Sequence, residues 1–191
     1  MTDLQNKQSL VINPHGIDKA VEDIRNVLKQ LTWVSHPFHI AQRFIRKIEN
    51  KLFTYPEIYI VDPDNKIESY HRLTPDNDYT GMFFFFVGNG RSNEDGYMEY
   101  NVSIIFSVNL ELIDENRLKN EHLFTQDLID SVRKKIKSNR FNFDSQMDYL
   151  RETRDLKEVY REFVLDNLEE YNRAPLQCFR VELLIKIDEE C

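Results

Sequence analysis

Two histidines near the start of the chain are spaced so that they could bind a metal ion together. His36 and His39 lie three residues apart in the sequence HPFH. Zinc sites combine such a pair with further His, Cys or acidic ligands, often in the pattern H-E-x-x-H. The chain lacks that pattern, and its other histidines are scattered. We therefore expect surface or capping histidines here, with a small cytoplasmic metal- or ligand-dependent enzyme as the alternative function.

Two polar loops show parts of known ligand-binding patterns. The sequence GNGRSN (88–93) lacks the third glycine of a dinucleotide loop, and a strand pattern follows it where phosphate binding needs a helix N-terminus. The sequence DPDNKIESYHRL begins like a calcium loop, but Lys66, Ile67 and Leu73 stand where an oxygen ligand, glycine and glutamate are needed. We interpret both segments as turns.

No pattern of nucleophilic or acid–base catalysis is visible. The chain has no G-x-S-x-G, and Cys178 lies on a predicted core strand, where cysteine usually serves as a small buried apolar residue. The carboxylate pairs Glu94/Asp95 and Glu169/Glu170 are sequence neighbours that would point in different directions. We therefore expect no catalytic residue and no metal site, and we do not expect an enzyme, although catalytic triads can assemble from residues that are distant in the sequence.

Composition sets further bounds on function. The 191 residues are 41% hydrophobic and have a net charge of -8, which favours a soluble protein with a substantial core. The first residues lack the basic start and apolar middle of a signal peptide, and no apolar run has membrane length. The acidic balance disfavours tight binding to phosphates. A nucleic-acid-binding adaptor stays as a second alternative.

The spacing of apolar residues predicts several helices. A first helix is expected over 14–31, and a second helix is expected to begin at Ser35 and Pro37, with a stripe of Ala41, Phe44, Ile45, Ile48 and Leu52. Further helices are expected from Asp114 to about Ile136 and from Asp155 to Tyr171, and the segment 139–154 shows no clear pattern.

Strand signals fill the middle and the end of the chain. Alternation or apolar runs predict strands over 57–61, 66–73, 82–87, 98–113 and 178–187. The run MFFFFV is apolar on both faces and belongs in the middle of a sheet. We predict an N-terminal arm (1–13) and a single α+β domain (14–191). Its sheet would be mostly antiparallel, with helices packed on one face and a long projecting hairpin over 81–113.

The length of this hairpin bears on assembly. A strand over 98–113 would span about 50 Å at ~3.4 Å per residue. The radius of gyration of a compact chain of this size is only about 16 Å. The hairpin should therefore project, with the loop 88–96 at its tip, and be stabilised by neighbouring chains. The alternative is a long strand, bent by a bulge, within an ordinary sheet.

The order of motifs resembles that of a known group of proteins. YPEIYIVD (55–62), YHRLTPDND (70–78), MFFFFV, the long alternating strand and APLQCFRVELLIKI follow one another along the chain. Over roughly residues 20–188 this order is similar to that of small neck and tail-completion proteins of tailed bacteriophages, especially crAss-like and other Bacteroidetes phages. The resemblance includes head–tail connector and tail terminator-like proteins.

The resemblance implies a structural virion protein of the neck or tail, made in the host bacterial cytoplasm. It would form a ring of twelve or six copies between portal and tail, in contact with the portal and adjacent neck or tail proteins. DNA would pass through the lumen without sequence-specific binding, and no membrane, cofactor or catalytic residue would be involved. An acidic chain suits such a lumen, because carboxylates repel phosphates.

The expected subunit contacts are the phenylalanine run, the hairpin tip and the N-terminal arm. The individual residues are Phe83, Phe84, Phe85, Phe86, Asn89, Arg91, Asn93, Glu94 and Asp95. For the phenylalanines the alternative is burial in the core, and for the tip it is a loop without a partner.

Overall fold

A computed structural model of the protein describes residues 8–9, 15–62, 67–93, 96–139, 141 and 145–188. Glu94, Asp95 and all of the N-terminal arm except Gln8 and Ser9 lie outside this part of the chain. All statements on structure below refer to the described residues.

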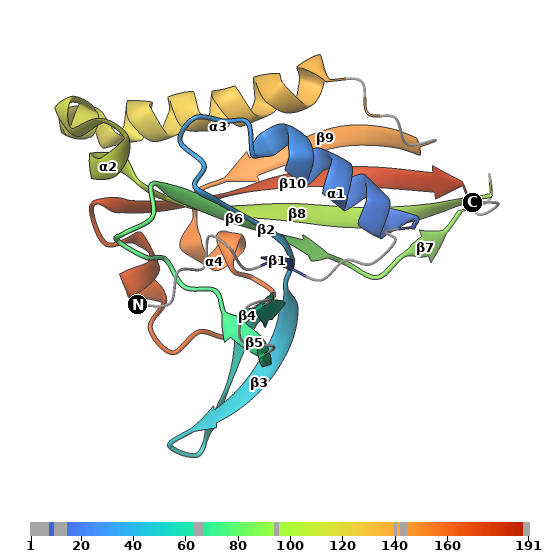
Figure 1. The fold of residues 1–191 in the computed structure, drawn as a ribbon, viewed down its shortest axis with the longest axis horizontal. Helices are drawn as coiled ribbons and strands as arrows, with labels where there is room; N and C mark the ends of the chain where they lie inside the picture. Colours follow the sequence, from blue (N-terminus) through green and yellow to red (C-terminus); the bar gives the residue numbers. More distant parts are fainter. Residues whose placement is uncertain are drawn as a thin grey trace.

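The main sheet has the strand order β2-β6-β8-β10-β9, and the short β7 pairs with β8 (Figure 1). Only β2 and β6 pair in parallel, and the other pairs are antiparallel. The bounds are β2 His36–Ile40, β6 Gly81–Val87, β7 Arg91–Ser92, β8 Tyr97–Asn109, β9 Ser145–Thr153 and β10 Leu176–Asp188.

Helices cover one face of this sheet. These are α1 (Ile17–Leu28) and α3 (Glu121–Ser138), and α2 (Leu110–Asp114) and η2 (Glu115–Asn120) join β8 to α3 (Figure 1). Both long helices turn an apolar stripe to the sheet, so that Ile24 and Ile129 pack with Phe83, Phe85 and other strand residues in one core cluster. The helix predicted over 14–31 is confirmed as α1.

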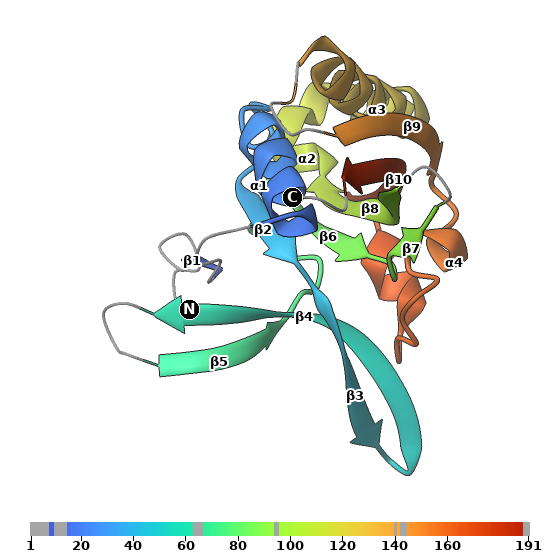
Figure 2. The same ribbon diagram turned by 90° about the vertical axis from the view of Figure 1, so that its right-hand side faces the viewer.

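A smaller sheet covers the opposite face (Figure 2). Its central strand β4 (Lys51–Asp62) pairs with β3 (Gln42–Ile48), β5 (Ile67–Arg72) and β1 (Gln8–Ser9). Together with α4 (Leu156–Val159) and η3 (Leu168–Asn172) it encloses a second core cluster, in which Ile58, Phe84 and Tyr160 are buried. The protein thus has three layers around two cores.

The predicted fold class, α+β with a mostly antiparallel sheet, is confirmed. One feature differs: helices lie on both faces of the main sheet, because α4 and η3 pack with the small sheet opposite α1 and α3.

The hairpin predicted to project over 81–113 lies inside the main sheet instead. β8 is flanked on one side by β10 along its full length and on the other by β6. The strand ends at Asn109, whose side-chain oxygen accepts hydrogen bonds from the backbone N–H of Glu111 (3.0 Å) and Leu112 (3.2 Å). This cap starts α2, and the predicted strand over 98–113 was therefore too long.

The element that projects is the β3–β4 hairpin, where the sequence predicted a second helix (Figures 1 and 2). β3 runs antiparallel to β4 from the pair Gln42–Glu57 to the pair Ile48–Lys51. The two turn residues, Glu49 (φ 47°) and Asn50 (φ 64°), both have a left-handed backbone. A two-residue loop of this kind matches the twist of paired strands. The apolar residues whose spacing suggested a helix therefore lie on the two strands of a hairpin.

One further segment had no predicted structure, and one further prediction needs correction. The segment 139–154, which showed no pattern, contains the edge strand β9. The helix predicted over 155–171 is only one turn long, because Val164 forms backbone hydrogen bonds to Thr54 of β4 in both directions (2.8 and 3.1 Å). The apolar spacing of that segment instead serves to bury Tyr160, Phe163 and Tyr171.

Candidate functional site

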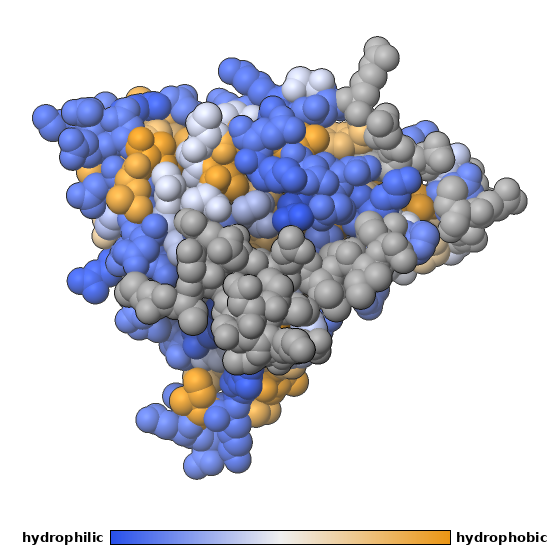
Figure 3. All heavy atoms as spheres, viewed as in Figure 1, coloured by the Kyte–Doolittle hydropathy of each residue, from blue (hydrophilic) through white to orange (hydrophobic). Residues whose placement is uncertain are grey.

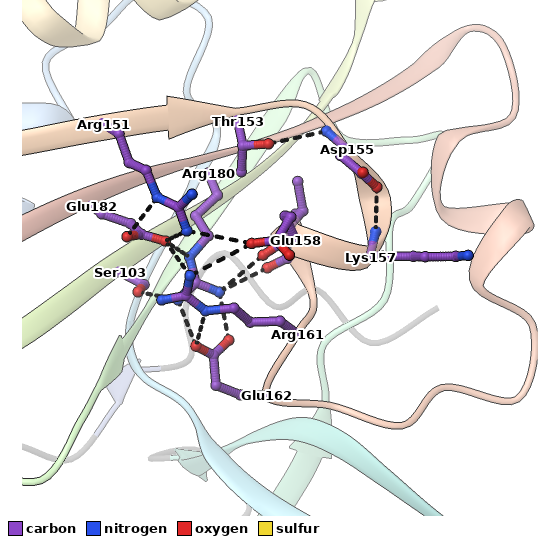
Figure 4. A network of polar contacts seen from close by, with 11 residues as sticks. Ser103, Arg151, Thr153, Asp155, Lys157, Glu158, Arg161, Glu162, Arg180 and Glu182 are labelled. Atoms are coloured by element: carbon purple, nitrogen blue, oxygen red, sulfur yellow. Dashed lines mark hydrogen bonds and ion pairs between the residues drawn. The ribbon is translucent and has the colours of Figure 1, made fainter.

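A network of three arginines and three glutamates lies between the main sheet and α4 (Figure 4). At its centre Arg180 is fully buried and donates to both carboxylate oxygens of Glu162 (2.5 and 2.6 Å). It also donates to Ser103 Oγ (2.5 Å) and to the backbone oxygens of Glu158 and Val159. Arg180 therefore ties β10 to both β8 and α4.

The outer part of the network neutralises the remaining charges. Arg151 donates to Glu182, and Arg161 lies within ion-pair distance of Glu158, Glu162 and Glu182. Burial alone would raise the pKa of Glu162, but the hydrogen bonds and charge of Arg180 outweigh burial and lower it. A carboxylate held ionised between two guanidiniums is a poor general acid or base. The network is best explained as a brace for α4.

The two histidines of the HPFH sequence are buried, so the expected surface or capping role is wrong. The ring of His36 stacks on Tyr79 with centroids 3.7 Å apart, whereas His39 Nε2 lies 3.7 Å from Glu22 Oε2 on α1. Burial lowers the pKa of His39, and Glu22 partly opposes this. No group of three or more His, Cys, Asp or Glu side chains that could hold a metal occurs among the described residues.

Cys178 is buried in the second core cluster, as expected for a structural cysteine. Its Sγ lies 3.5 Å from Tyr160 Oη and 2.8 Å from the backbone oxygen of Tyr171. Burial raises the pKa of the thiol to about 11. The thiol is therefore protonated near neutral pH and cannot act as a nucleophile.

The phenylalanine run lies mostly inside the protomer. Phe83, Phe84 and Phe85 have at most 1% of their surface exposed, and only Phe86 is half-buried. Phe83 and Phe85 belong to the core under the helices, whereas Phe84 points to the second core. Their burial matches the alternative of core packing, and the first three are not accessible to another subunit in this conformation.

The loop after β6 is attached to the main sheet. Asn89 and Arg91 are exposed, and Arg91 pairs with Glu99 in the β7–β8 ladder. Asn93 donates from Nδ2 to Glu99 Oε1 (3.0 Å) and accepts from the backbone N–H of Tyr97 (3.0 Å). The described part of this loop is thus folded against β8, and it does not project as a free tip.

The most exposed apolar side chains near the small sheet lie on the β3–β4 hairpin. Ile45 is 68% exposed, Leu52 is 65% exposed, and Val164 beside them is 57% exposed. Ile45 and Val164 both pair with Thr54, and Leu52 is two residues before it on β4, so the three side chains share one face. We call Ile45, Leu52 and Val164 the hairpin patch; Figure 3 shows apolar side chains exposed at this end of the molecule.

Basic side chains lie on both faces of the hairpin: Arg43 and Lys47 share the face of the hairpin patch, whereas Arg46 and Lys51 lie on the other face. Residues 42–53 contain four basic residues and one acidic residue. Arg46 is paired with the buried Glu57 (2.6 Å), and the guanidinium of Arg43 lies over the ring of Phe86. Lys47 and Lys51 are exposed at the far end of the hairpin. An exposed apolar surface rimmed by charge is typical of a protein-interaction site.

The base of the hairpin is firmly attached, although its far end projects. The guanidinium of Arg72 lies 3.4 Å from the ring centroid of Tyr55 and donates to Asp166 and to Tyr171 Oη (both 3.1 Å). Together with the Thr54–Val164 bridge, these contacts fix β4 and β5 to the segment after α4. The base of the hairpin is therefore held in a fixed position relative to the rest of the protein.

One hollow lies between the end of α3 and β9. It has a volume of about 460 Å³, and its lining includes Ile136, Lys137, Met147 and Asp148. Lys137 Nζ lies 5.6 Å from the ring centroid of Tyr149, which also lines the hollow. This lining shows no converging set of acid, base and nucleophile, and we assign no chemistry to it.

Comparison with known proteins gives no relative. No protein-family model matches the chain, and no curated protein and no solved structure matches it either.

None of the described helices is long and apolar enough to cross a membrane.

The hairpin patch was missed in the sequence because Ile45, Ile48 and Leu52 fit a helical stripe. Two signals pointed the other way. Asn50 is a residue type that tolerates left-handed turns, and the flanking sequence is rich in β-branched and aromatic residues.

Proposed function

We propose that the protein is a structural subunit that assembles with copies of itself into a ring in the neck or tail of a tailed bacteriophage. The observation that best supports assembly is the hairpin patch. Its three apolar side chains are more than half exposed: Ile45 and Leu52 lie on an arm that projects from the body of the protein, and Val164 lies beside that arm. Phage origin rests on the order of sequence motifs, which resembles that of neck and tail-completion proteins.

The hairpin patch favours assembly because the protomer alone leaves it in water. Burial of apolar surface contributes roughly 25 cal/mol per Å². An exposed two-stranded arm gains this stabilisation only against another chain, and two-stranded hairpins are marginal in water alone. An arm that is fixed at its base and carries exposed apolar side chains on one face is suited to contact a neighbouring subunit.

The described chemistry also supports a structural role. Arg151, Arg161 and Arg180 are bound to glutamates, Cys178 is protonated, and the two buried histidines have different neighbours. We propose no catalytic activity and no cofactor. In the ring, the portal and adjacent neck or tail proteins would be the neighbours, and DNA would pass through an acidic lumen that repels phosphate.

Light scattering coupled to size-exclusion chromatography tests the proposal. We expect a mass that rises from that of the 22.9 kDa protomer to a fixed multiple as the protein concentration increases. Negative-stain imaging should then show closed rings. A protein that stays a protomer up to high micromolar concentration, alone and mixed with its portal, would contradict the ring.

A further inference from the structure

We propose that the hairpin patch of one copy docks on the surface of α2, η2 and the start of α3 of the next copy. This inference rests on the proposed function, because it names the two surfaces through which the ring would form.

The acceptor surface is apolar at its centre. Leu112 on α2 is 51% exposed, and Leu123 in the first turn of α3 is 62% exposed. α2 contacts α3, and Leu110 and Phe124 beside these leucines belong to one core cluster, so Leu112 and Leu123 lie on neighbouring elements. Figure 3 shows apolar side chains exposed in the region of α2. We call Glu111, Leu112, Glu115 and Leu123 the acceptor surface.

The charge of the acceptor surface complements that of the hairpin. Residues 111–127 contain five acidic and two basic residues, whereas residues 42–53 contain one acidic and four basic residues. Arg117 is paired with Asp127, which leaves Glu111 and Glu115 exposed and without an ion pair among the described residues. Lys47 and Lys51 are likewise exposed and have no ion pair there.

The apolar side chains of the hairpin patch would contact those of the acceptor surface, and the lysines of the hairpin would contact its glutamates. Lysines facing Glu111 and Glu115 would set the orientation of docking, while the apolar residues of both surfaces would be buried. DNA phosphates would satisfy the lysines but would leave Ile45, Leu52 and Val164 in water. The combination therefore favours a protein partner over a nucleic acid.

The two surfaces lie on opposite sides of the main sheet. The hairpin belongs to the layer with β4 and β5, and α2 belongs to the layer with α1 and α3 (Figures 1 and 2). A contact between two different surfaces of identical chains is head-to-tail, and it repeats from copy to copy, giving a ring when the rotation between copies closes. This is the type of interface that a ring requires.

Two complementary variants test the contact directly. Ile45→Asp with Leu52→Asp disables the hairpin patch, and Leu112→Asp with Leu123→Asp disables the acceptor surface. All four side chains are more than half exposed, so both variants should fold as the parent does. Each variant alone should stay a protomer. Mixed in equal amounts they should form a one-to-one dimer by light scattering, because one intact hairpin patch meets one intact acceptor surface.

A charge exchange provides an independent test. Lys47→Glu with Lys51→Glu should weaken self-association at least about tenfold, as should Glu111→Lys with Glu115→Lys. All four changes in one chain should restore association. Lys134→Glu with Lys157→Glu changes the net charge as much as the hairpin substitutions, at exposed positions outside both surfaces, and should have no comparable effect.

The outcomes separate this inference from the ring itself. If the parent chain forms rings but the mixed variants remain protomers, another surface makes the contact, and the inference fails while the ring function stands. If the parent chain never assembles, both fail. If the hairpin lysines prove to bind duplex DNA and the charge exchange does not restore association, the hairpin has a different partner and the inference is wrong.

Discussion

Arg180 shows how a charged residue can be kept inside this protein. Its side chain is buried, and its guanidinium nitrogens lie close to oxygen atoms of Glu162, Glu182, Ser103 and the backbone of α4. Removing one partner of a buried ion pair leaves the other charge without compensation. The network should therefore affect stability most when its central residue is changed.

We expect Arg180→Met to lower the free energy of unfolding by about 3–5 kcal/mol, because Glu162 loses its bidentate partner. Arg151→Met is the matched control. Arg151 is half exposed and its pair with Glu182 lies at the edge of the network, so the loss should be about 1 kcal/mol or less. Urea unfolding followed by the fluorescence of the buried Trp33 measures both values. Equal losses would show that Arg180 is no more important than a surface arginine.

His39 should give the stability of the protein a pH dependence. Burial lowers its pKa in the folded state, so below the ordinary value of 6.5 the unfolded chain binds the proton more strongly. Its contribution is fully present above pH 6.5 and is lost as the pH falls through the lowered pKa of the folded state. The groups that act on the ring are Glu22, Arg25 and Asp18, all on α1.

His39→Leu should therefore reduce the loss of stability between neutral pH and pH 5, measured by urea unfolding at each pH. Leucine removes the interactions of the ring with Glu22 and Asp18, but Glu22 keeps the hydrogen bonds that Arg25 and Asn26 donate to it. His15→Leu, at an exposed position, is the control and should keep the slope of the parent chain. An unchanged slope in His39→Leu would mean that other groups cause the pH dependence.

At the scale of elements, prediction from the sequence was most accurate where the spacing of apolar residues and their burial indicate the same element. The alternation from Met98 onward predicted the strand β8, and the apolar run at Phe83–Phe86 placed β6 inside a sheet, as found. The prediction failed where one spacing of apolar residues fits both a helix and a hairpin. Ile45, Ile48 and Leu52 suit a helix by their spacing, but pairing with Thr54 and the left-handed turn at Asn50 make them part of a hairpin.

The candidate site could not be predicted for a related reason. The exposure of Ile45 and Leu52 depends on where the hairpin stands relative to the rest of the protein. That position is fixed by the Thr54–Val164 bridge and by Arg72 on Tyr55, which join residues that are distant in the sequence. No local sequence pattern encodes these contacts. The sequence therefore favoured the phenylalanine run, which is mostly buried, as a subunit contact.

Shortening the hairpin should separate folding from assembly. Replacing residues 47–52 with Asn-Gly makes Arg46–Phe53 the closing pair and supplies residues suited to the turn. The change removes Leu52 and both lysines but keeps the Thr54–Val164 bridge. We expect the free energy of unfolding to change by about 1 kcal/mol or less, since the removed side chains are all exposed.

Light scattering of the shortened protein should show only protomers. A matched control replaces only the turn residues Glu49-Asn50 with Asn-Gly, which keeps the hairpin length and should keep assembly. If the shortened protein still forms rings, the far end of the hairpin, with Leu52 and both lysines, is not a contact element.

At the scale of the whole molecule, charge is distributed unevenly. The chain has a net charge of -8, although residues 42–53 contain four basic residues and only one acidic residue. The rest of the protein therefore repels the phosphate backbone while the hairpin attracts it. Since only two or three cations of the hairpin could reach a duplex together, binding should resemble weak non-specific association, with a dissociation constant of roughly 10⁻⁴ M or above at physiological salt.

Fluorescence anisotropy with a labelled DNA duplex, titrated at several salt concentrations, checks this expectation. Any binding at low salt should have a slope of log K against log salt of about -2 to -3, because few phosphates are neutralised. Lys47→Glu with Lys51→Glu should remove it, and Lys134→Glu with Lys157→Glu should not. Micromolar affinity at physiological salt with a steep slope would instead favour a nucleic-acid adaptor, because a ring through which DNA slides must not hold its phosphates tightly.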